Sequence, residues 1–539
     1  MNSANRMLKF DDLKYATVWL IAALLSFPVF GAELSPDQRA DFKQDIVASI
    51  EDKAKLAQVM NDMIFSFGEL GFQEFETSNY ITGMLADNGF EVVRGISGIP
   101  TAWMASWGEG EPVIALGSDI DGIPKASQKP GVAYREPIVV GAPGHGEGHN
   151  SGQVVNYLAA ITIKEIMQAN GFQGTIKMWP GVAEEQLGTK AYYVRDGYFE
   201  DVDAVLFSHV STNLSTSYGG GRGNGLVSIQ YDFGGESAHS AGAPWRGRSA
   251  LDAVSLMDIG MNFRREHLRL SQRIHSVVVD GGDQPNVVPS EASIWYFLRE
   301  SDYENIKSLW QIGDDMAAGA ALMSNTTWSS KVLGTAWPGH FNKAMAERNY
   351  QHAQMVGMPD WSEEDLILAK AVQAELGVEQ EGLNTEVQEL SEPPDPTRNT
   401  GGGSDDIGDI SWQVPTITLR YPSNIPNLPG HNWVNAIAMA TPIAHKGIVA
   451  GAKVQAMNLF DLLTDEQLLT DAWDYYNEVQ TKDMQYTSLL RPQDQPAIHL
   501  NEGIMATFRP IMRDYYYDPS QYETYMEQLG VEYPTVRSD

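Results

Sequence analysis

Residues 112–121 have the sequence PVIALGSDID, an apolar run that ends in two aspartates. A short, continuous apolar run of this kind is consistent with a fully buried strand. Further strand candidates follow at residues 175–179 and 204–207, and a helical pattern separates each candidate from the next. Strands that alternate with helices predict an α/β fold with a mostly parallel central sheet flanked by helices.

The pattern changes after the three glycines at 219–221. The predicted order is then strand, helix, strand, strand, helix, strand, at residues 225–233, 249–264, 273–280, 292–297, 303–323 and 326–332. This βαββαβ order predicts a ferredoxin-like module of two layers. Because a strand at 416–420 and a helix at 442–459 return to the first pattern, we expect the module to be inserted into the α/β domain.

We therefore divide the chain into five segments. An export signal is predicted at 1–32, the two parts of an α/β catalytic domain at 33–217 and 335–460, and the inserted domain at 218–334. The last segment, 461–539, is acidic and aromatic, and we expect it to be helical. No chemistry is predicted for it.

The first segment has the features of a signal peptide. Basic residues precede an apolar stretch at 16–30, which ends in the small residues Gly31 and Ala32. The stretch is too short for a comfortable membrane span, so we predict export to the periplasm or the exterior, with an uncleaved anchor as the alternative. The absence of cysteine fits an oxidising compartment.

The chain of 539 residues has a formal net charge of −33, from 70 acidic and 37 basic residues. Nucleic acids are bound by clustered lysine and arginine, so this balance excludes a nucleic-acid partner. An acidic substrate would need a few local cations in the site that binds it.

Residues 144–151 have the sequence GHGEGHNS, with two imidazoles and a carboxylate between small residues. Alternate residues of an extended segment point the same way, so His145, Glu147 and His149 are candidates to converge on one divalent metal ion. In the alternative interpretation His145 is only a hydrogen-bond partner of a ligand.

Further polar residues follow strands of the predicted sheet. The carboxyl ends of parallel strands are where open α/β sheets bind their ligands. These positions hold carboxylates and imidazoles, namely Asp119, Asp121, Glu184, Glu185, His209 and His431. Each is weak evidence alone, since paired glutamates are usually solvated and a lone histidine is usually a hydrogen-bonded core residue. Their occurrence together at strand ends predicts one site.

In their order, these motifs resemble the two-metal aminoacylase and carboxypeptidase-like metallopeptidase family, in its amidohydrolase branch. The resemblance covers about residues 60–460, through the stretches SDIDGIP (118–124), GHGEGHNS (144–151), AEE (183–185), SAH (237–239), GRSALDAV (247–254), PNVVP (285–289), GDISW (408–412) and AHKG (444–447). It implies a zinc-peptidase-like fold whose inserted module is a lid and dimerisation domain. It also implies a homodimer that hydrolyses N-acyl or aryl-acyl amino acids or short peptides.

The resemblance also implies roles for individual residues. Two divalent metal ions, zinc foremost with manganese or cobalt as alternatives, would be bound by Glu147, His149, Glu185, His209 and His431. Glu184 would be the general base and Asp121 would orient the ligands. His239, Asn286 and Arg299 would hold the scissile carbonyl and the substrate carboxylate. The Pro-Gly-His sequence of His431 recurs at His340, but only His431 follows the GDISW stretch.

One position departs from the family pattern, because the amidohydrolase branch has a cysteine where this chain has Glu147. A carboxylate still binds divalent ions, and it favours sites rich in nitrogen and oxygen. The rival hypothesis is a metal-free binding or scaffold protein on the same fold. Neither a Gly-x-Ser-x-Gly elbow nor a His-Glu-x-x-His motif occurs, which excludes the common serine hydrolases and single-zinc proteases.

Overall fold

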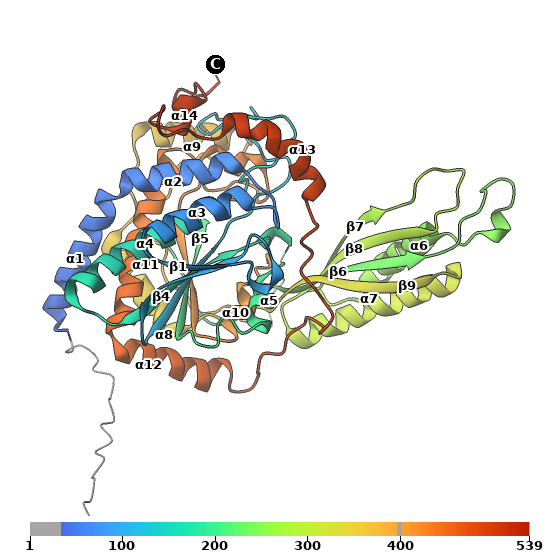
Figure 1. Ribbon diagram of the computed structural model, residues 1–539, viewed down its shortest axis with the longest axis horizontal. Helices are drawn as coiled ribbons and strands as arrows, with labels where there is room; N and C mark the ends of the chain where they lie inside the picture. The colour runs from blue at the N-terminus through green and yellow to red at the C-terminus, as the bar shows by residue number, and fades with distance from the viewer. Residues whose placement is uncertain (1–33, 187, 222, 396–401, 538–539) are drawn as a thin grey trace, which may run out of the picture.

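A computed structural model describes residues 34–186, 188–221, 223–395 and 402–537, which form a large α/β body with one module projecting from it (Figure 1). The predicted export signal lies outside these ranges. Within them, no helix is both long and apolar enough to cross a membrane.

The body is built around a six-stranded sheet with the order β1-β2-β4-β3-β5-β10. Its strands are β1 (Glu91–Arg94), β2 (Trp103–Glu109), β3 (Val113–Asp119), β4 (Gly174–Gly181), β5 (Ala204–Ser211) and β10 (Thr416–Pro422). The pairs β4–β3, β3–β5 and β5–β10 are parallel, whereas β1 and β2 are joined antiparallel at one edge. The predicted mostly parallel sheet is confirmed.

Helices pack around this sheet. They are α1 (Pro36–Asp52), α2 (Ala54–Phe67), α3 (Phe75–Asp87), α4 (Gly152–Asn170), α5 (Lys190–Arg195), α8 (Lys343–Val356), α9 (Glu363–Glu375), α10 (Ile407–Ser411) and α11 (Pro442–Thr464). The helix α4 packs against β3 and α11, and its side chains from Gln153 to Ile163 are buried. It begins at a glycine because a Cβ on Gly152 would lie 1.8 Å from the Ser118 hydroxyl oxygen.

The inserted module has the predicted βαββαβ order. Its elements are β6 (Gly225–Gly234), α6 (Ala250–Arg264), β7 (Arg273–Asp280), β8 (Glu291–Glu300), α7 (Tyr303–Ser324) and β9 (Thr327–Ala336). The four strands form an antiparallel sheet in the order β7-β8-β6-β9, with α6 and α7 packed against each other and against it. Side-chain caps from Ser249 and Asp302 start the two helices.

Aromatic rings join the module to the body. The indole ring of Trp337 stacks on Tyr303 at 4.3 Å and packs against Trp412 and Tyr486 at 5.3 and 5.1 Å between ring centroids. Tyr486 also donates a hydrogen bond of 2.7 Å to the buried carboxylate of Asp409. The base of the module therefore shares its core with the body and with the C-terminal extension.

The C-terminal extension is less helical than its composition predicts. Beyond α12 (Glu466–Tyr475) and a short π-helix (Tyr476–Gln480), the part described up to residue 537 holds only α13 (Glu502–Met512) and the single turn α14 (Tyr525–Gln528) as α-helix. Prolines at 492 and 496 remove two backbone donors from the segment before α13. The extension runs instead along the surface, from the base of the module to α2 (Figure 1).

One ion pair connects this extension to a loop beside the sheet. The guanidinium of Arg509 lies 3.0 Å from the Glu69 carboxylate, which is fully buried and also accepts the backbone N–H groups of Glu76 and Thr77 at the start of α3. The backbone carbonyl of Glu69 accepts the N–H of Gly122 at 2.7 Å. Arg509 thus stabilises the segment that follows β3.

We predict that Arg509→Met lowers the free energy of unfolding by about 3 kcal/mol, because it leaves a buried carboxylate without its cation. The measurement is urea unfolding of the purified protein. The control is Arg513→Met, which removes a more exposed pair with Glu76 and should change stability little. Equal shifts for both variants would contradict a specific role for Arg509.

Candidate metal centre

The polar residues predicted from the sequence meet where β3, β4 and β5 end, at a cavity of about 510 Å³ beside the base of the inserted module. The lining includes the predicted carboxylates and imidazoles together with two arginines, namely Glu147, Glu184, Glu185, His209, Arg299, Arg420 and His431. The site therefore combines residues from both parts of the body with one residue of the module.

The glycine-rich run does not form the extended segment that its alternating pattern predicted. Its backbone turns, and Gly148 has φ of 107°, a conformation that disfavours other residues. His145 consequently points away from Glu147 and His149. Its Nε2 lies 3.2 Å from the Ile64 carbonyl, and burial lowers the pKa of His145 to about 3. The expected convergence of all three side chains is wrong.

Two groups of side chains are arranged to hold a cation. Glu147, His149 and Glu185 offer ligand atoms within 4.8 Å of one another, and so do Asp119, His149 and His209. The Nε2 of His149, one Glu185 oxygen and one Asp119 oxygen are buried without a hydrogen-bond partner among the described residues. Buried polar atoms are rarely left unpaired, so these donors fit a divalent ion that accepts nitrogen and oxygen ligands.

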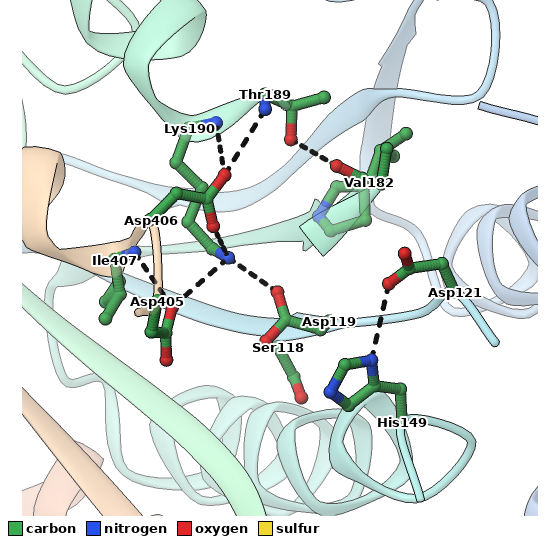
Figure 2. Close-up of polar contacts among 12 residues, drawn as sticks. Ser118, Asp119, Asp121, His149, Val182, Thr189, Lys190, Asp405, Asp406 and Ile407 are labelled. Atoms are coloured by element: carbon green, nitrogen blue, oxygen red, sulfur yellow. Dashed lines mark hydrogen bonds and ion pairs between the residues drawn. The ribbon is translucent and has the colours of Figure 1, made fainter. Parts of the chain in front are cut away.

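Asp121 fixes two of these ligands. One of its carboxylate oxygens lies 3.3 Å from Nδ1 of His149, and the other accepts the backbone N–H of Glu185 at 3.1 Å (Figure 2 shows the histidine contact). Although burial opposes it, this contact raises the pKa of His149 to about 10. A metal ion bound here displaces a proton from the imidazole.

Of the two histidines in Pro-Gly-His turns, His431 lies with the carboxylates. Its Nε2 is 2.6 Å from Glu147 and 3.4 Å from Glu185, and the Glu147 contact raises the pKa of His431 to about 9. His340 instead faces the Tyr475 hydroxyl at 3.1 Å, and burial lowers the pKa of His340 to about 4. The geometry agrees with the sequence-based choice of His431.

Glu184 lies in a short 3₁₀ turn after β4 and faces the cavity, although its side chain is almost entirely buried. Burial first, and then the charge of Asp119, raise the pKa of Glu184 well above its ordinary value. A carboxyl group with a raised pKa is suited to taking and giving a proton near neutral pH.

Sequence reasoning missed a buried cation behind these ligands. The ammonium of Lys190 lies 2.6 Å from Asp119 and 3.6 Å from Asp405, and it also contacts Asp406 (Figure 2). The backbone N–H of Lys190 donates to Asp406 as well, at 3.1 Å. Lysine is almost never buried unless it is paired, so only the position of Lys190 shortly after Glu184 hinted at this role.

The three residues predicted for substrate binding are not brought together. Arg299, on β8, lines the cavity, and its Nε has no hydrogen-bond partner among the described residues. His239 and Asn286 are exposed in the two loops beyond Gly234 and Glu291, which are paired at the opposite end of the sheet from the Gly225–Glu300 pair. Ten strand residues separate those ends, roughly 30 Å.

We predict that Asp121→Asn lowers the affinity for zinc roughly 10- to 100-fold, because the amide presents a donor to the imidazole and ligand orientation is lost. Zinc titration with a competing chelator measures this change. The control is Asp203→Asn, since Asp203 also accepts a backbone N–H, that of Val113, at the other end of β3. An unchanged affinity in Asp121→Asn would contradict the assigned role.

The chain is similar to known proteins over most of its length. A family model for a peptidase dimerisation domain matches residues 222–319, within the inserted module. One of the subunits of the p-aminobenzoyl-glutamate hydrolase of Escherichia coli K12 is 33% identical over 450 residues, which cover 78% of this chain and 91% of that protein. A mouse Xaa-Arg dipeptidase is 24% identical over 439 residues, 79% of this chain and 90% of the relative.

The fold has also been observed in a solved structure. The crystal structure of a predicted aminohydrolase from methicillin-resistant Staphylococcus aureus superimposes with a TM-score of 0.54 at 17% identity, covering 78% of this chain and all of that one. Together with the identity to the Escherichia coli hydrolase, these similarities show that the chain belongs to the M20 family of metal-dependent amidohydrolases and peptidases.

Proposed function

We propose that the protein hydrolyses the amide bond of N-acyl amino acids or short peptides, with two divalent metal ions and with Glu184 as the general base. The observation that carries the proposal is the set of buried, unpartnered donor atoms on His149, Glu185 and Asp119, directly beside Glu184 in one cavity. The names of the relatives, a p-aminobenzoyl-glutamate hydrolase and a dipeptidase, support this substrate class.

In this proposal the metal ions are held by the five predicted ligands, Glu147, His149, Glu185, His209 and His431. The set contains only nitrogen and oxygen donors, which suits zinc and also manganese or cobalt. Asp119 is a further candidate, because it shares a ligand group with His149 and His209. When bound, such ions polarise a carbonyl and lower the pKa of a water molecule.

The side chains have separate tasks. Asp121 orients His149 and the backbone at Glu185. Glu184 takes a proton from the attacking water and delivers it to the leaving nitrogen, which its position in the cavity and its raised pKa allow. Arg299 pairs bidentately with a substrate carboxylate.

We further propose a dimer formed through the inserted module. The match to a peptidase dimerisation domain supports it. The register of the module's sheet keeps His239 and Asn286 of one chain far from that chain's own cavity, so in the dimer these residues would serve the other protomer. A second copy is the proposed partner; because the Escherichia coli relative is named as one subunit of its enzyme, a different chain is the alternative.

Export to the periplasm or the exterior is also proposed, from the charged and apolar pattern of residues 1–32 and the lack of cysteine. Mass determination of the mature amino terminus after expression tests it. Loss of about the first 32 residues is expected, whereas an intact amino terminus on a membrane-bound protein would support the anchor instead.

We predict that Glu184→Gln lowers kcat roughly 10²- to 10⁴-fold on N-acyl glutamates while about two metal ions per chain are retained. Turnover and elemental mass spectrometry measure the two quantities, with Glu200→Gln, an exposed glutamate of the same domain, as the control. If the wild-type protein neither binds metal nor turns over substrate, the scaffold hypothesis motivated by Glu147 replaces the hydrolase.

We also predict a change of metal preference for Glu147→Cys, which restores the residue of the amidohydrolase branch. A thiolate ligand favours softer ions, so binding of zinc should be kept while that of manganese weakens. Competition between the two metals measures the preference. An unchanged ratio would mean that Glu147 does not contact the metal ion.

A further inference from the structure

One side of the cavity is formed almost entirely by hydroxyl groups. We call these residues the hydroxyl wall; they are Ser211, Ser215, Thr216, Ser217 and Thr418. They follow or belong to β5 and β10, the two strands next to the metal-ligand cluster. Among the described residues that line the cavity, only Phe341 and Ile407 have apolar side chains.

The hydroxyl wall is held in place by its backbone. Ser215 and Arg420 exchange both main-chain hydrogen bonds, at 3.0 and 2.9 Å. The hydroxyl of Thr216 donates to the carbonyl of Thr418 at 3.0 Å. Because the segment after β5 is thus paired to β10, these hydroxyl groups keep fixed positions and are arranged before a ligand binds.

Two buried polar atoms of the lining lack a protein partner. Thr418 is 7% exposed, and its Oγ1 accepts and donates no hydrogen bond among the described residues. Asn224 is 2% exposed; its amide nitrogen donates to the Gly402 carbonyl at 2.8 Å, but its Oδ1 has no partner within the described ranges. Leaving such atoms unpaired costs stability, so a site that keeps them has a use for them.

A cation adjoins the wall. Alternate residues of a strand share a face, so Thr418 and Arg420 both point into the cavity from β10. The guanidinium of Arg420 lies 3.1 Å from the His209 ring and forms no ion pair with a described carboxylate. Its remaining N–H groups are therefore free to donate, in a chain whose net charge is −33.

We infer that the hydroxyl wall, with Asn224 and Arg420, is the subsite for the acyl part of the substrate, and that this part is hydrophilic. An acyl group that offers hydroxyl or amide groups, as the aminoacyl residue of a short peptide does, pairs with Thr418 and Asn224. An aromatic acyl group leaves these atoms desolvated and unpaired. The inference rests on the proposed hydrolase function and narrows its substrate class.

Three substrates with the same leaving amino acid test this inference, namely N-acetylseryl-glutamate, N-acetylalanyl-glutamate and p-aminobenzoyl-glutamate. With the metal-loaded full chain, kcat/KM should be at least about tenfold higher for the seryl substrate than for the aromatic one, with the alanyl substrate between them. A higher value for the aromatic substrate would overturn the inference.

Thr418→Val isolates the hydroxyl, because it keeps the shape and removes the unpartnered oxygen. It should lower kcat/KM for the seryl substrate about tenfold and leave that for the aromatic substrate within about twofold. The control, Thr335→Val, removes another buried hydroxyl without a partner among the described residues, in β9 and outside the cavity lining. Equal losses on both substrates would show a merely structural role.

If no substrate is hydrolysed, the proposed function fails, and the subsite is tested separately by binding. Calorimetric titration of the metal-loaded Glu184→Gln variant with each uncleaved substrate gives the dissociation constants. Tighter binding of the seryl substrate, lost in Glu184→Gln combined with Thr418→Val, supports the hydrophilic subsite. Equal or tighter binding of the aromatic substrate contradicts it.

Discussion

The buried ammonium of Lys190 is the contact on which the arrangement of the site depends. It joins Asp119, at the end of β3, to Asp405 and Asp406, which lie on the other side of the inserted module in the sequence. The two parts of the α/β body thus meet at one cation. An isolated buried lysine would be costly, but here carboxylates surround it and raise its pKa well above the ordinary value in spite of burial. Each carboxylate that pairs with Lys190 adjoins a strand end where the site is built.

The rest of the site is fixed from the rear of these strand ends. The carboxylate of Glu74 accepts the backbone N–H of Ala183, directly before Glu184, at 2.9 Å. The carbonyl of Glu69 holds Gly122 after Asp121, and Arg509 of the C-terminal extension pairs with the Glu69 side chain. A segment for which the sequence predicts no chemistry therefore supports two residues of the proposed mechanism. The apolar core sets the positions of the strands, and these buried polar contacts set the side chains at their ends.

The sequence predicted the fold well because hydrophobic periodicity reports directly on strands and helices. The apolar run before Asp119 and the βαββαβ order after residue 221 both correspond to observed elements. The direction of His145 was missed, since one glycine with positive φ reverses a side chain without changing the pattern. Lys190 was missed because a lysine that is buried among carboxylates has no periodic signature. The distance of His239 from the cavity depends on strand register, which the sequence does not specify, and the path of the C-terminal extension depends on long-range pairs such as Arg509 with Glu69.

The central claim is that Glu147, in place of a cysteine, completes a centre for two metal ions with oxygen and nitrogen ligands only. X-ray absorption at the zinc edge of the zinc-loaded protein tests it most directly. We expect a first shell of nitrogen and oxygen at about 2.0–2.2 Å and a second zinc ion at about 3.5–4 Å. A single zinc ion without a zinc neighbour, or a protein that takes up no zinc, would contradict it.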